Sequence, residues 1–341
     1  MPVKKTNQNH RLRPALLAGI MVASLIACTG AIGTGGPAAA WLYVATGTGL
    51  SISSNYGASW ITYLGSNAVN RVYVADAVPS IYAATSTGLS VSSDGWATWT
   101  TYTSATTGFG GNVINGVYVV GSGSSPSIYA ATDAGLSVSV DGGATWTTYL
   151  GGAVNGVCVS AGTIYAATSA GLTVSTDGGA SWPNNYTSAT AGFGTSSIVS
   201  AVYVVGSGPG ASIYAGTSGG GVSISTNGGA SWSNYPATGP TTGPASNIIQ
   251  DIFVSAGTLY AATDSGLSVS ADGGTTWTTY TTASTGTMLS NNVRGVFASG
   301  TSVYAATTAG LSISTNSRTS WATITNIQGL AGNDVRGAFL H

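Results

Sequence analysis

Short apolar stretches alternate with polar, glycine-rich ones along residues 41–341, and the same order of stretches recurs about every 44 residues. One unit contains VNGVCVS (154–160), then TIYAAT (163–168), a glycine turn, GLTVS (171–175) and a short polar stretch. Runs of this length, rich in Val, Ile, Tyr and Thr and bounded by Gly and Ser, predict β-strands. The pattern therefore predicts an all-β protein with four strands in each unit.

An eight-residue segment, here called the box, connects the third and fourth strands of each unit. The seven copies are SSNYGASW (53–60), SSDGWATW (92–99), SVDGGATW (139–146), STDGGASW (175–182), STNGGASW (225–232), SADGGTTW (270–277) and STNSRTSW (314–321). Their third residues are Asn55, Asp94, Asp141, Asp177, Asn227, Asp272 and Asn316. Their last residues are Trp60, Trp99, Trp146, Trp182, Trp232, Trp277 and Trp321.

The third box residue is the first candidate for chemistry. An Asp side chain in a turn accepts N–H groups from residues just ahead of it, and Gly143 can take the positive φ that such a turn requires. Three copies have Asn, which keeps the acceptor oxygen but loses the charge. The comparison predicts a structural turn, with the tryptophan packing between neighbouring units.

The ends of the repeat pattern predict how the units close. The pattern opens at Leu42 with a second strand, LYVATGTGLSIS, and ends with a first strand, DVRGAFLH (334–341). Pairing of this C-terminal strand with the three N-terminal strands completes a seventh unit and removes two open sheet edges. We therefore expect an all-β, seven-bladed β-propeller of four-stranded antiparallel blades, closed as a ring.

The box consensus S-x-D-x-G-x-[ST]-W resembles the Asp-box (BNR) repeat of sialidases, sortilin-type receptors, certain glucanases and photosystem II assembly-factor propellers. The resemblance covers residues 42–341 and implies the propeller fold. In that family the boxes lie at the blade periphery, away from the binding faces, so the resemblance says little about function.

The first 40 residues differ from the repeats. Basic residues precede the apolar stretch ALLAGIMVASLIA (15–27), which is too short to span a bilayer and is typical of a secretory signal peptide. Leu25 to Cys28 (LIAC) resembles the bacterial lipobox, which implies cleavage before Cys28 and lipidation of its thiol. The alternative is ordinary signal-peptidase cleavage near Ala31 or Ala40. We expect a signal peptide (1–27), a flexible lipoprotein tether (28–40) and a propeller (41–341) held at the cell envelope, at the outer membrane in a Gram-negative host.

Cysteine and charge content restrict the function further. With Cys28 lipidated, Cys158 is expected to be an unpaired, small buried side chain. Only 5% of the chain is charged, and no lysine follows the signal, so we expect no nucleic-acid partner and membrane contact only through the anchor. So few titratable groups also predict a stability that varies little with pH.

Catalysis is not expected. The chain contains no glutamate, which nearly excludes sialidase chemistry, and its two histidines, His10 and His341, support neither a metal site nor a triad. Asp133 and Asp264 fall in blades three and six, too far apart for a carboxylate pair. We predict no cofactor and no metal.

One set of positions breaks the repeat in a chemically directed way. The residues just ahead of the first-strand hydrophobics should surround the central funnel, with Arg71 nearby: Arg336, Asn70, Asn115, Asn155, Ser200, Gln250 and Arg294. Such a ring suits an anionic or polyhydroxylated ligand. The alternative is local pairing of Arg294 with Asp251 and of Arg336 with Asp334.

A second candidate surface is formed by the related loops after blades two and four. They contain Phe109 and Phe193, expected on the funnel side, where aromatic rings bind sugars or a partner. The alternative is that each ring packs on its own blade.

The sequence thus predicts a monomeric, non-catalytic envelope lipoprotein that acts as a binding or assembly scaffold for a protein or a glycan. Two alternatives stay open: a carbohydrate-binding or glycan-degrading surface protein, and a membrane-complex assembly factor of the photosystem II type. The small number of arginines counts against the second, because that family's resemblance implies an arginine-rich patch.

Overall fold

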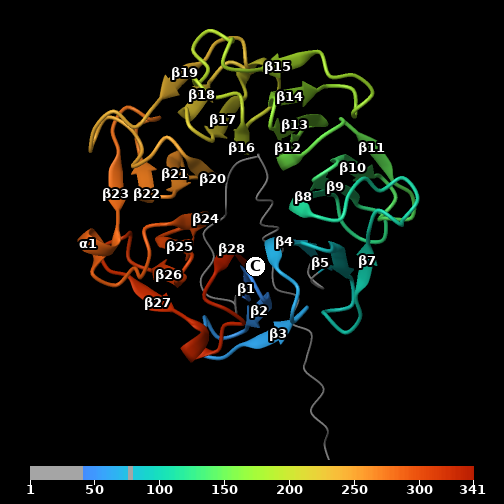
Figure 1. Cartoon of the computed structure of the whole chain (residues 1–341), viewed down its shortest axis with the longest axis horizontal. Helices are drawn as coiled ribbons and strands as arrows, with labels where there is room; N and C mark the ends of the chain where they lie inside the picture. Colours follow the sequence, from blue (N-terminus) through green and yellow to red (C-terminus); the bar gives the residue numbers. More distant parts are fainter. Residues whose placement is uncertain (1–40, 76–79) are drawn as a thin grey trace, which may run out of the picture.

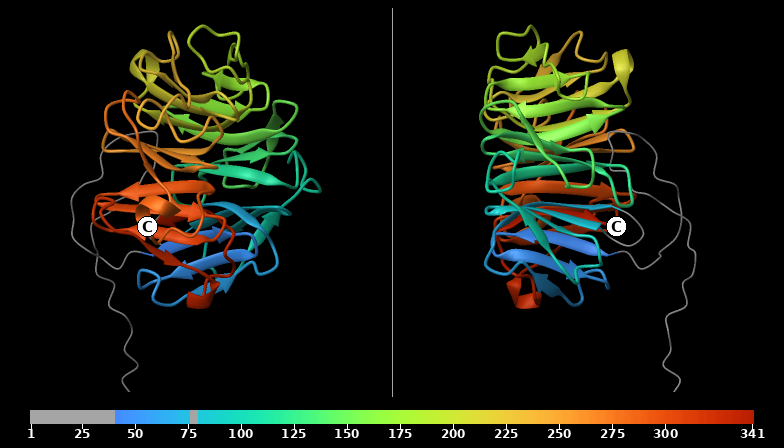
Figure 2. Two further views of the ribbon diagram at one scale, coloured as in Figure 1. Left: turned by 60° about the vertical axis from the view of Figure 1, so that its left-hand side comes forward. Right: turned by 90° about the vertical axis from the view of Figure 1, so that its right-hand side faces the viewer.

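The computed structural model describes residues 41–75 and 80–341. These residues form seven four-stranded antiparallel sheets, arranged as blades around a central axis (Figure 1). Seen from the side, the strands of successive blades lie one above another and the ring is flat (Figure 2). The prediction of a seven-bladed β-propeller is confirmed.

Each blade contributes one strand to each of four concentric layers. The innermost strands are β4 (Val69–Ala75), β8 (Ile114–Val120), β12 (Val154–Ser160), β16 (Val199–Val205), β20 (Ile249–Ser255), β24 (Val293–Ser299) and β28 (Val335–Leu340). The second strands are β1 (Leu42–Thr46), β5 (Ser80–Thr85), β9 (Ser127–Thr132), β13 (Thr163–Thr168), β17 (Ser212–Thr217), β21 (Thr258–Thr263) and β25 (Ser302–Thr307).

The outer half of each blade is shorter. The third strands are β2 (Gly49–Ser53), β6 (Gly88–Ser92), β10 (Gly135–Ser139), β14 (Gly171–Ser175), β18 (Gly221–Ser225), β22 (Gly266–Ser270) and β26 (Gly310–Ser314). The fourth strands are β3 (Ile61–Tyr63), β7 (Thr100–Tyr102), β11 (Thr147–Tyr149), β15 (Asn184–Tyr186), β19 (Ser233–Tyr235), β23 (Thr278–Tyr280) and β27 (Ala322–Ile324). Short helices occur only in connections: η1 (Gly208–Gly210), α1 (Thr282–Thr285) and η2 (Asn326–Gln328).

Blade 1 combines the two ends of the described chain, in the order β28-β1-β2-β3, and blades 2 to 7 follow in sequence. Beyond the paired strands, the backbone N–H of Trp41 donates to the His341 carbonyl at 2.8 Å, and His341 returns the bond at 2.9 Å. The predicted closure of the ring by the C-terminal strand is therefore confirmed.

The core lies between blades. The fifth residue of the inner strand is aromatic in six blades, and neighbouring rings are in contact from Tyr118 through Tyr73, Phe339, Phe297 and Phe253 to Tyr203. In the remaining blade, blade 4, Cys158 occupies this fifth position of the inner strand. It is buried as expected, with 3% exposure, but it is disulfide-bonded and not a free thiol. The expectation of an unpaired Cys158 is therefore wrong.

The box turns have the predicted geometry. Asp141 Oδ1 accepts the Thr145 backbone N–H at 2.9 Å and the Ser139 hydroxyl at 2.7 Å, while Oδ2 accepts the Thr145 hydroxyl at 2.6 Å. Gly143 has φ +96°, as predicted. These hydrogen bonds lower the pKa of Asp141 from 3.8 to about 2. Asp94, Asp177 and Asp272 make equivalent bonds, and their pKa values are likewise lowered to about 2.

The asparagine boxes make the same turn with one bond reversed. Asn55 Oδ1 accepts the Ser59 backbone N–H at 2.9 Å, but Asn55 Nδ2 donates to the Ser59 hydroxyl at 2.8 Å. Asn227 and Asn316 repeat this arrangement. The turn therefore needs an acceptor oxygen and tolerates either direction for the second bond, which explains why Asp and Asn alternate.

The box tryptophans pack between blades, as predicted. Trp146 of blade 3 is 6% exposed, and its ring lies 5.0 Å from that of Tyr102 in blade 2.

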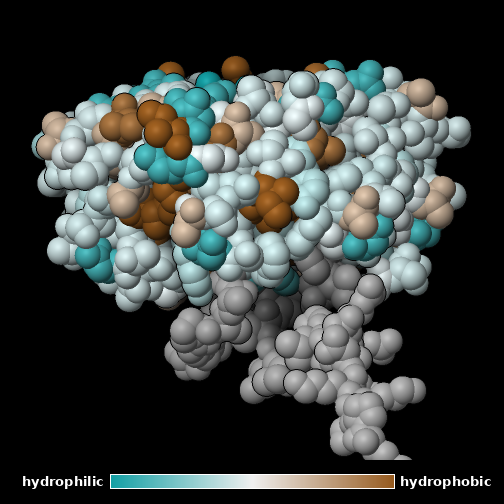
Figure 3. All heavy atoms as spheres, turned by 90° about the horizontal axis from the view of Figure 1, so that it is seen from below, coloured by the Kyte–Doolittle hydropathy of each residue, from teal (hydrophilic) through white to brown (hydrophobic). Residues whose placement is uncertain are grey.

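Exposed hydrophobic side chains form separate patches on the side seen in Figure 3. Among residues 41–75 and 80–341, no helix has the length and apolar character to cross a bilayer.

Candidate functional site

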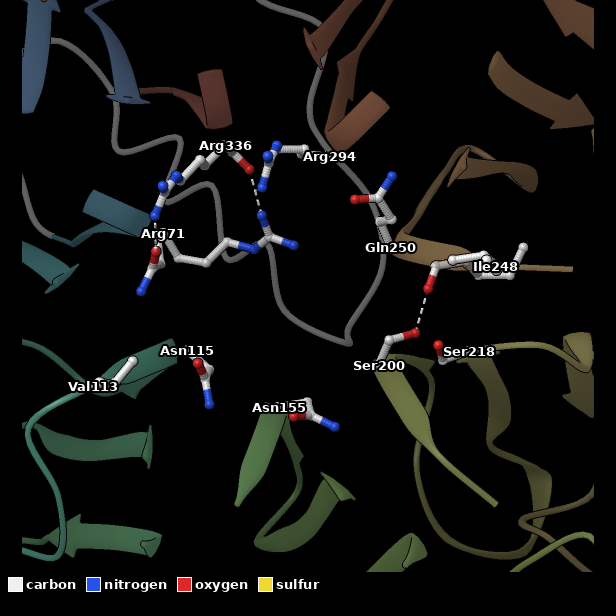
Figure 4. Close-up of a pocket in the computed structure, with 12 residues that line it drawn as sticks. Arg71, Val113, Asn115, Asn155, Ser200, Ser218, Ile248, Gln250, Arg294 and Arg336 are labelled. Carbon is white, nitrogen blue, oxygen red and sulfur yellow. Dashed lines mark hydrogen bonds between the residues drawn. The ribbon is translucent and has the colours of Figure 1, made fainter. Parts of the chain in front are cut away.

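A polar pocket of about 440 Å³ lies at the end of the central axis where the inner strands begin (Figure 4). It is here called the funnel pocket. Its lining includes all seven residues predicted for the funnel ring, together with Arg71. The other lining residues are Val113, Ser218, Ile248 and Ile249.

A β-bulge in every inner strand aims these seven side chains into the pocket. In blade 4, Val154 pairs with Thr168 and Gly156 with Ala167, so that Asn155 between them has no partner across the strand pair. The same register shift occurs in the other six blades. Such a bulge inserts one residue and re-aims its side chain. Nothing in the apolar pattern of the inner strands predicts it.

Most of the ring residues also connect adjacent blades. The side-chain amide of Asn155 donates to the Val199 carbonyl of the next blade at 2.8 Å, and Asn115 donates to the Val154 carbonyl at 2.9 Å. Asn70 and Ser200 bond the carbonyls of Ile114 and Ile249 in the same way. Gln250 instead donates to Asn292 Oδ1 at 2.7 Å. These five side chains therefore hold the ring together as well as lining the pocket.

Three arginines and two aspartates gather on one side of the pocket. Asp334 contacts both Arg294, at 3.0 Å, and Arg336, at 3.2 Å. The Arg294 contact is an ion pair without hydrogen-bond alignment, because Arg294 Nε and Asp334 Oδ1 lack a hydrogen-bond partner. The cluster has one more positive than negative charge, and Arg294, with 38% of its side chain exposed, is its most accessible member.

Arg71 extends past two blades on this side of the pocket (Figure 4). It starts on blade 2, bonds the Arg336 carbonyl of blade 1, and ends at Asp251 of blade 6, with Nη2 3.1 Å from Oδ1. Its path lies over Gly295 and Gly337, where an added Cβ would come within 3.3 Å and 3.6 Å of the arginine. Small residues at this third strand position in the intervening blades therefore leave room for the bridge.

Asp251 is held from two sides. It also accepts the Val296 backbone N–H at 3.0 Å, and its side chain is 20% exposed. Burial raises the pKa of Asp251, while the Arg71 guanidinium and these hydrogen bonds oppose that rise. Its partner is therefore Arg71 and not Arg294, which corrects the predicted local pairing. The predicted contact of Arg336 with Asp334 does occur.

The two loop phenylalanines are not exposed. Phe109 is 5% and Phe193 6% exposed, and their rings lie 4.8 Å and 4.9 Å from Trp146 and Trp232 of the following blades. They offer no free aromatic surface, so the expectation of a second binding surface there is wrong. Each ring packs against the next blade's box tryptophan and also stacks on a tyrosine of its own blade, Phe109 on Tyr102 at 6.3 Å and Phe193 on Tyr186 at 6.4 Å, so the alternative of packing on the own blade is correct in part.

The structure also places the remaining sequence candidates. Asp133 lies beside the inner strand of its own blade, where Oδ1 accepts the Val113 N–H at 3.3 Å, and Asp264 bonds Ser265. Within the described ranges no group of three or more metal-ligating side chains occurs. Cys28 lies outside the described residues.

No protein-family model matches the sequence, and no curated protein matches it. Solved structures match the fold. The extracellular domain of a B. thetaiotaomicron protein described as a hybrid two component system has a TM-score of 0.58 and 19% identity, over 79% of this chain and 37% of its own. YCF48 from Cyanidioschyzon merolae has a TM-score of 0.54 and 15% identity, over 85% of this chain and 89% of its own.

A GH74 enzyme from Niastella koreensis has a TM-score of 0.51 and 21% identity, over 86% of this chain and 46% of its own. The chain spans 35–37% of the length of the three B. thetaiotaomicron chains it matches. At these identities the likeness establishes the fold alone. Fold and site together define the class: the protein is a seven-bladed β-propeller with a bulge-lined polar pocket at one end of its axis.

Proposed function

We propose that this chain is an exported, non-catalytic binding protein whose funnel pocket takes an acidic segment of a partner protein. The observation that carries the proposal is the convergence of seven bulge residues on one pocket with an excess of arginine. Guanidinium groups match carboxylates in shape and charge, and the surrounding amides supply neutral hydrogen bonds.

The lining favours a protein over a glycan. Sugar sites use aromatic faces, and no aromatic residue is among the twelve that line the pocket. Its edge instead has half-exposed aliphatic side chains, Ile248 at 43% and Val113 at 36%. A segment that combines a carboxylate with aliphatic side chains fits this surface. Binding and scaffolding also suit the charge pairing, because the carboxylates of Asp251 and Asp334 are occupied by arginines and not poised as an acid–base pair.

Export is proposed from the signal sequence, and the extracellular domains among the structural neighbours are consistent with it. Lipidation of Cys28 stays a prediction. Lipidation would exclude a disulfide between the chain's two cysteines, because a lipid-modified thiol at Cys28 cannot also bond to Cys158.

The test uses a peptide array of acidic, neutral and basic segments, read in parallel with a glycan array. We expect acidic peptides to bind the wild-type protein, and Arg294→Ala to weaken that binding by about 10- to 100-fold, since one charge-assisted bond contributes about 1.5–3 kcal/mol. Arg294→Lys, which keeps the charge but not the planar fork, should lose less. Added salt should weaken the wild-type interaction.

Arg294 suits this test because its only ion pair is a half-exposed one, so the variant should stay folded. Identical peptide binding by wild type and Arg294→Ala would overturn the proposal. An Arg294-dependent signal on the glycan array with none on the peptide array would support the carbohydrate-binding alternative instead.

A further inference from the structure

A second pocket lies between blades 6 and 7, at the opposite end of the inner strands from the funnel pocket. It is here called the rim pocket. It has a volume of about 150 Å³ and is lined by the turns after β20 and β24 and by the box of blade 7. The residues that matter below are Ser255, Thr258, Tyr260, Thr301, Ser317 and Arg318.

Arg318 replaces the usual glycine at a box position whose positive φ disfavours side chains. Five of the seven boxes have glycine at this fifth position, Gly143 among them, and its φ there is positive. Arg318 has φ +72°, and Ser317 before it has φ +56°. Two consecutive non-glycine residues in the left-handed region are unfavourable, and residues held in such conformations cluster at functional sites.

The charge of Arg318 is not neutralised by any carboxylate in the described part of the chain, unlike that of Arg71, Arg294 and Arg336. Its guanidinium lies 5.8 Å from the centre of the Tyr260 ring, and Nη1 donates to the Tyr260 hydroxyl at 3.1 Å. Its Nε–H is buried without a hydrogen-bond partner. Among the described residues, only Nη1 of the three guanidinium nitrogens has a hydrogen-bond partner, so the arginine is fixed in place and Nη2 keeps its donors for a ligand.

The rest of the rim pocket is uncharged and rich in hydroxyl groups. Ser255, Thr258, Ser317 and Thr301 line it, and Gly300 exposes backbone beside them. The Thr301 hydroxyl donates to the Thr315 carbonyl at 3.0 Å, so the donors for a ligand are the other three hydroxyls and Arg318. Hydroxyl and guanidinium donors around one small concavity match the acceptor oxygens of a tetrahedral or planar oxyanion. We propose that the rim pocket binds an oxyanion, a sulfate, phosphate or carboxylate group, through Arg318. This site is separate from the funnel pocket and does not depend on the function proposed for it.

The repeat itself supplies the decisive variant. Arg318→Gly restores the residue found in five other boxes and relieves the positive φ, so it should keep or raise the melting temperature in plain buffer. Wild-type protein is titrated with sodium sulfate, sodium phosphate and sodium acetate against sodium chloride at equal ionic strength. We expect a saturable rise in melting temperature of about 1–2 °C at ten times Kd for at least one oxyanion.

The rise should disappear in Arg318→Gly, shrink in Arg318→Lys and persist in Arg294→Gln, the matched loss of an arginine at the funnel pocket. The salt series identifies which oxyanion geometry fits. An equal rise in wild type and Arg318→Gly would overturn the proposal, because the salts would then act on the whole surface. A lower melting temperature of Arg318→Gly without salt, combined with no oxyanion-specific rise in wild type, would also overturn it and leave Arg318 as a packing residue.

Discussion

The outer and inner edges of the blades each repeat one backbone feature seven times, with opposite consequences for the side chains. At the outer edge the box turn keeps nearly the same residues in every blade. At the inner edge the bulge keeps its geometry, but its side chain is Asn in three blades, Ser or Gln in two and Arg in two. The Asp or Asn of a box accepts N–H groups of its own turn, whereas a bulge side chain contacts the neighbouring blade and the shared pocket. The hydrogen bonds that a box turn needs are the same in all seven blades, so its residues stay nearly constant. The pocket does not need the same side chain from every blade, so the bulge residues differ.

The largest expected difference between the two edges is in packing. Trp146→Ala removes a buried ring that contacts Tyr102 and Phe109, so the free energy of unfolding should fall by about 3–5 kcal/mol. Asn155→Ala removes one amide bond to the Val199 carbonyl and should cost about 1 kcal/mol. Denaturant unfolding of both variants checks the comparison. Equal losses would mean that the bulge ring contributes as much to cohesion as the box tryptophans.

A smaller effect should separate two kinds of ion pair within the inner edge. A double-mutant cycle on Arg71 and Asp251, 30% and 20% exposed, should give a coupling of about 1–3 kcal/mol, because the pair links blades 2 and 6 and is partly desolvated. The same cycle on Arg294 and Asp334 should give about 0–1 kcal/mol, since those side chains are more exposed. Equal couplings from denaturant unfolding would contradict the distinction between a structural bridge and an accessible arginine.

The smallest effect per residue concerns acid at the outer edge. The folded-state pKa values of Asp94, Asp141, Asp177 and Asp272 are about 2, below the ordinary 3.8, so the unfolded chain binds protons first as the pH falls. Their contribution is present above about pH 4 and is lost toward pH 2. Asp251, whose pKa is raised, acts in the opposite direction.

Urea unfolding between pH 5 and 2 should therefore show a decline in wild type that the fourfold Asp→Asn variant lacks. The three natural asparagine boxes indicate that this variant will fold. A wild-type profile as steep as that of the variant would show that the box carboxylates are not linked to folding. These lowered pKa values restrict the flat pH profile expected from composition to the range above about pH 4.

The parts of the molecule that could be predicted are those that recur at the same position in every repeat. The box turn, the blade count and the closing strand follow from the sequence because each depends on local spacing or on the phase of the pattern. The Arg71–Asp251 bridge does not, because its partners are 180 positions apart in sequence and two blades lie between them in the ring. The burial of Phe109 does not follow from the sequence for a related reason: its loop has the composition of an exposed connection, but a tryptophan of the next blade covers the ring.

The construction of blade 1 has a consequence for the order of folding. Strand β1 precedes its inner-strand partner β28 by almost 300 residues, whereas every other second strand directly follows the inner strand with which it pairs. Contacts so distant in sequence form slowly, since the intervening chain must first be confined. As the chain is synthesised, blades 2 to 7 can assemble one after another while β1 presents an open edge to the solvent. The ring closes last, so a chaperone that shields β1 until β28 has been synthesised would protect the protein at its most aggregation-prone stage.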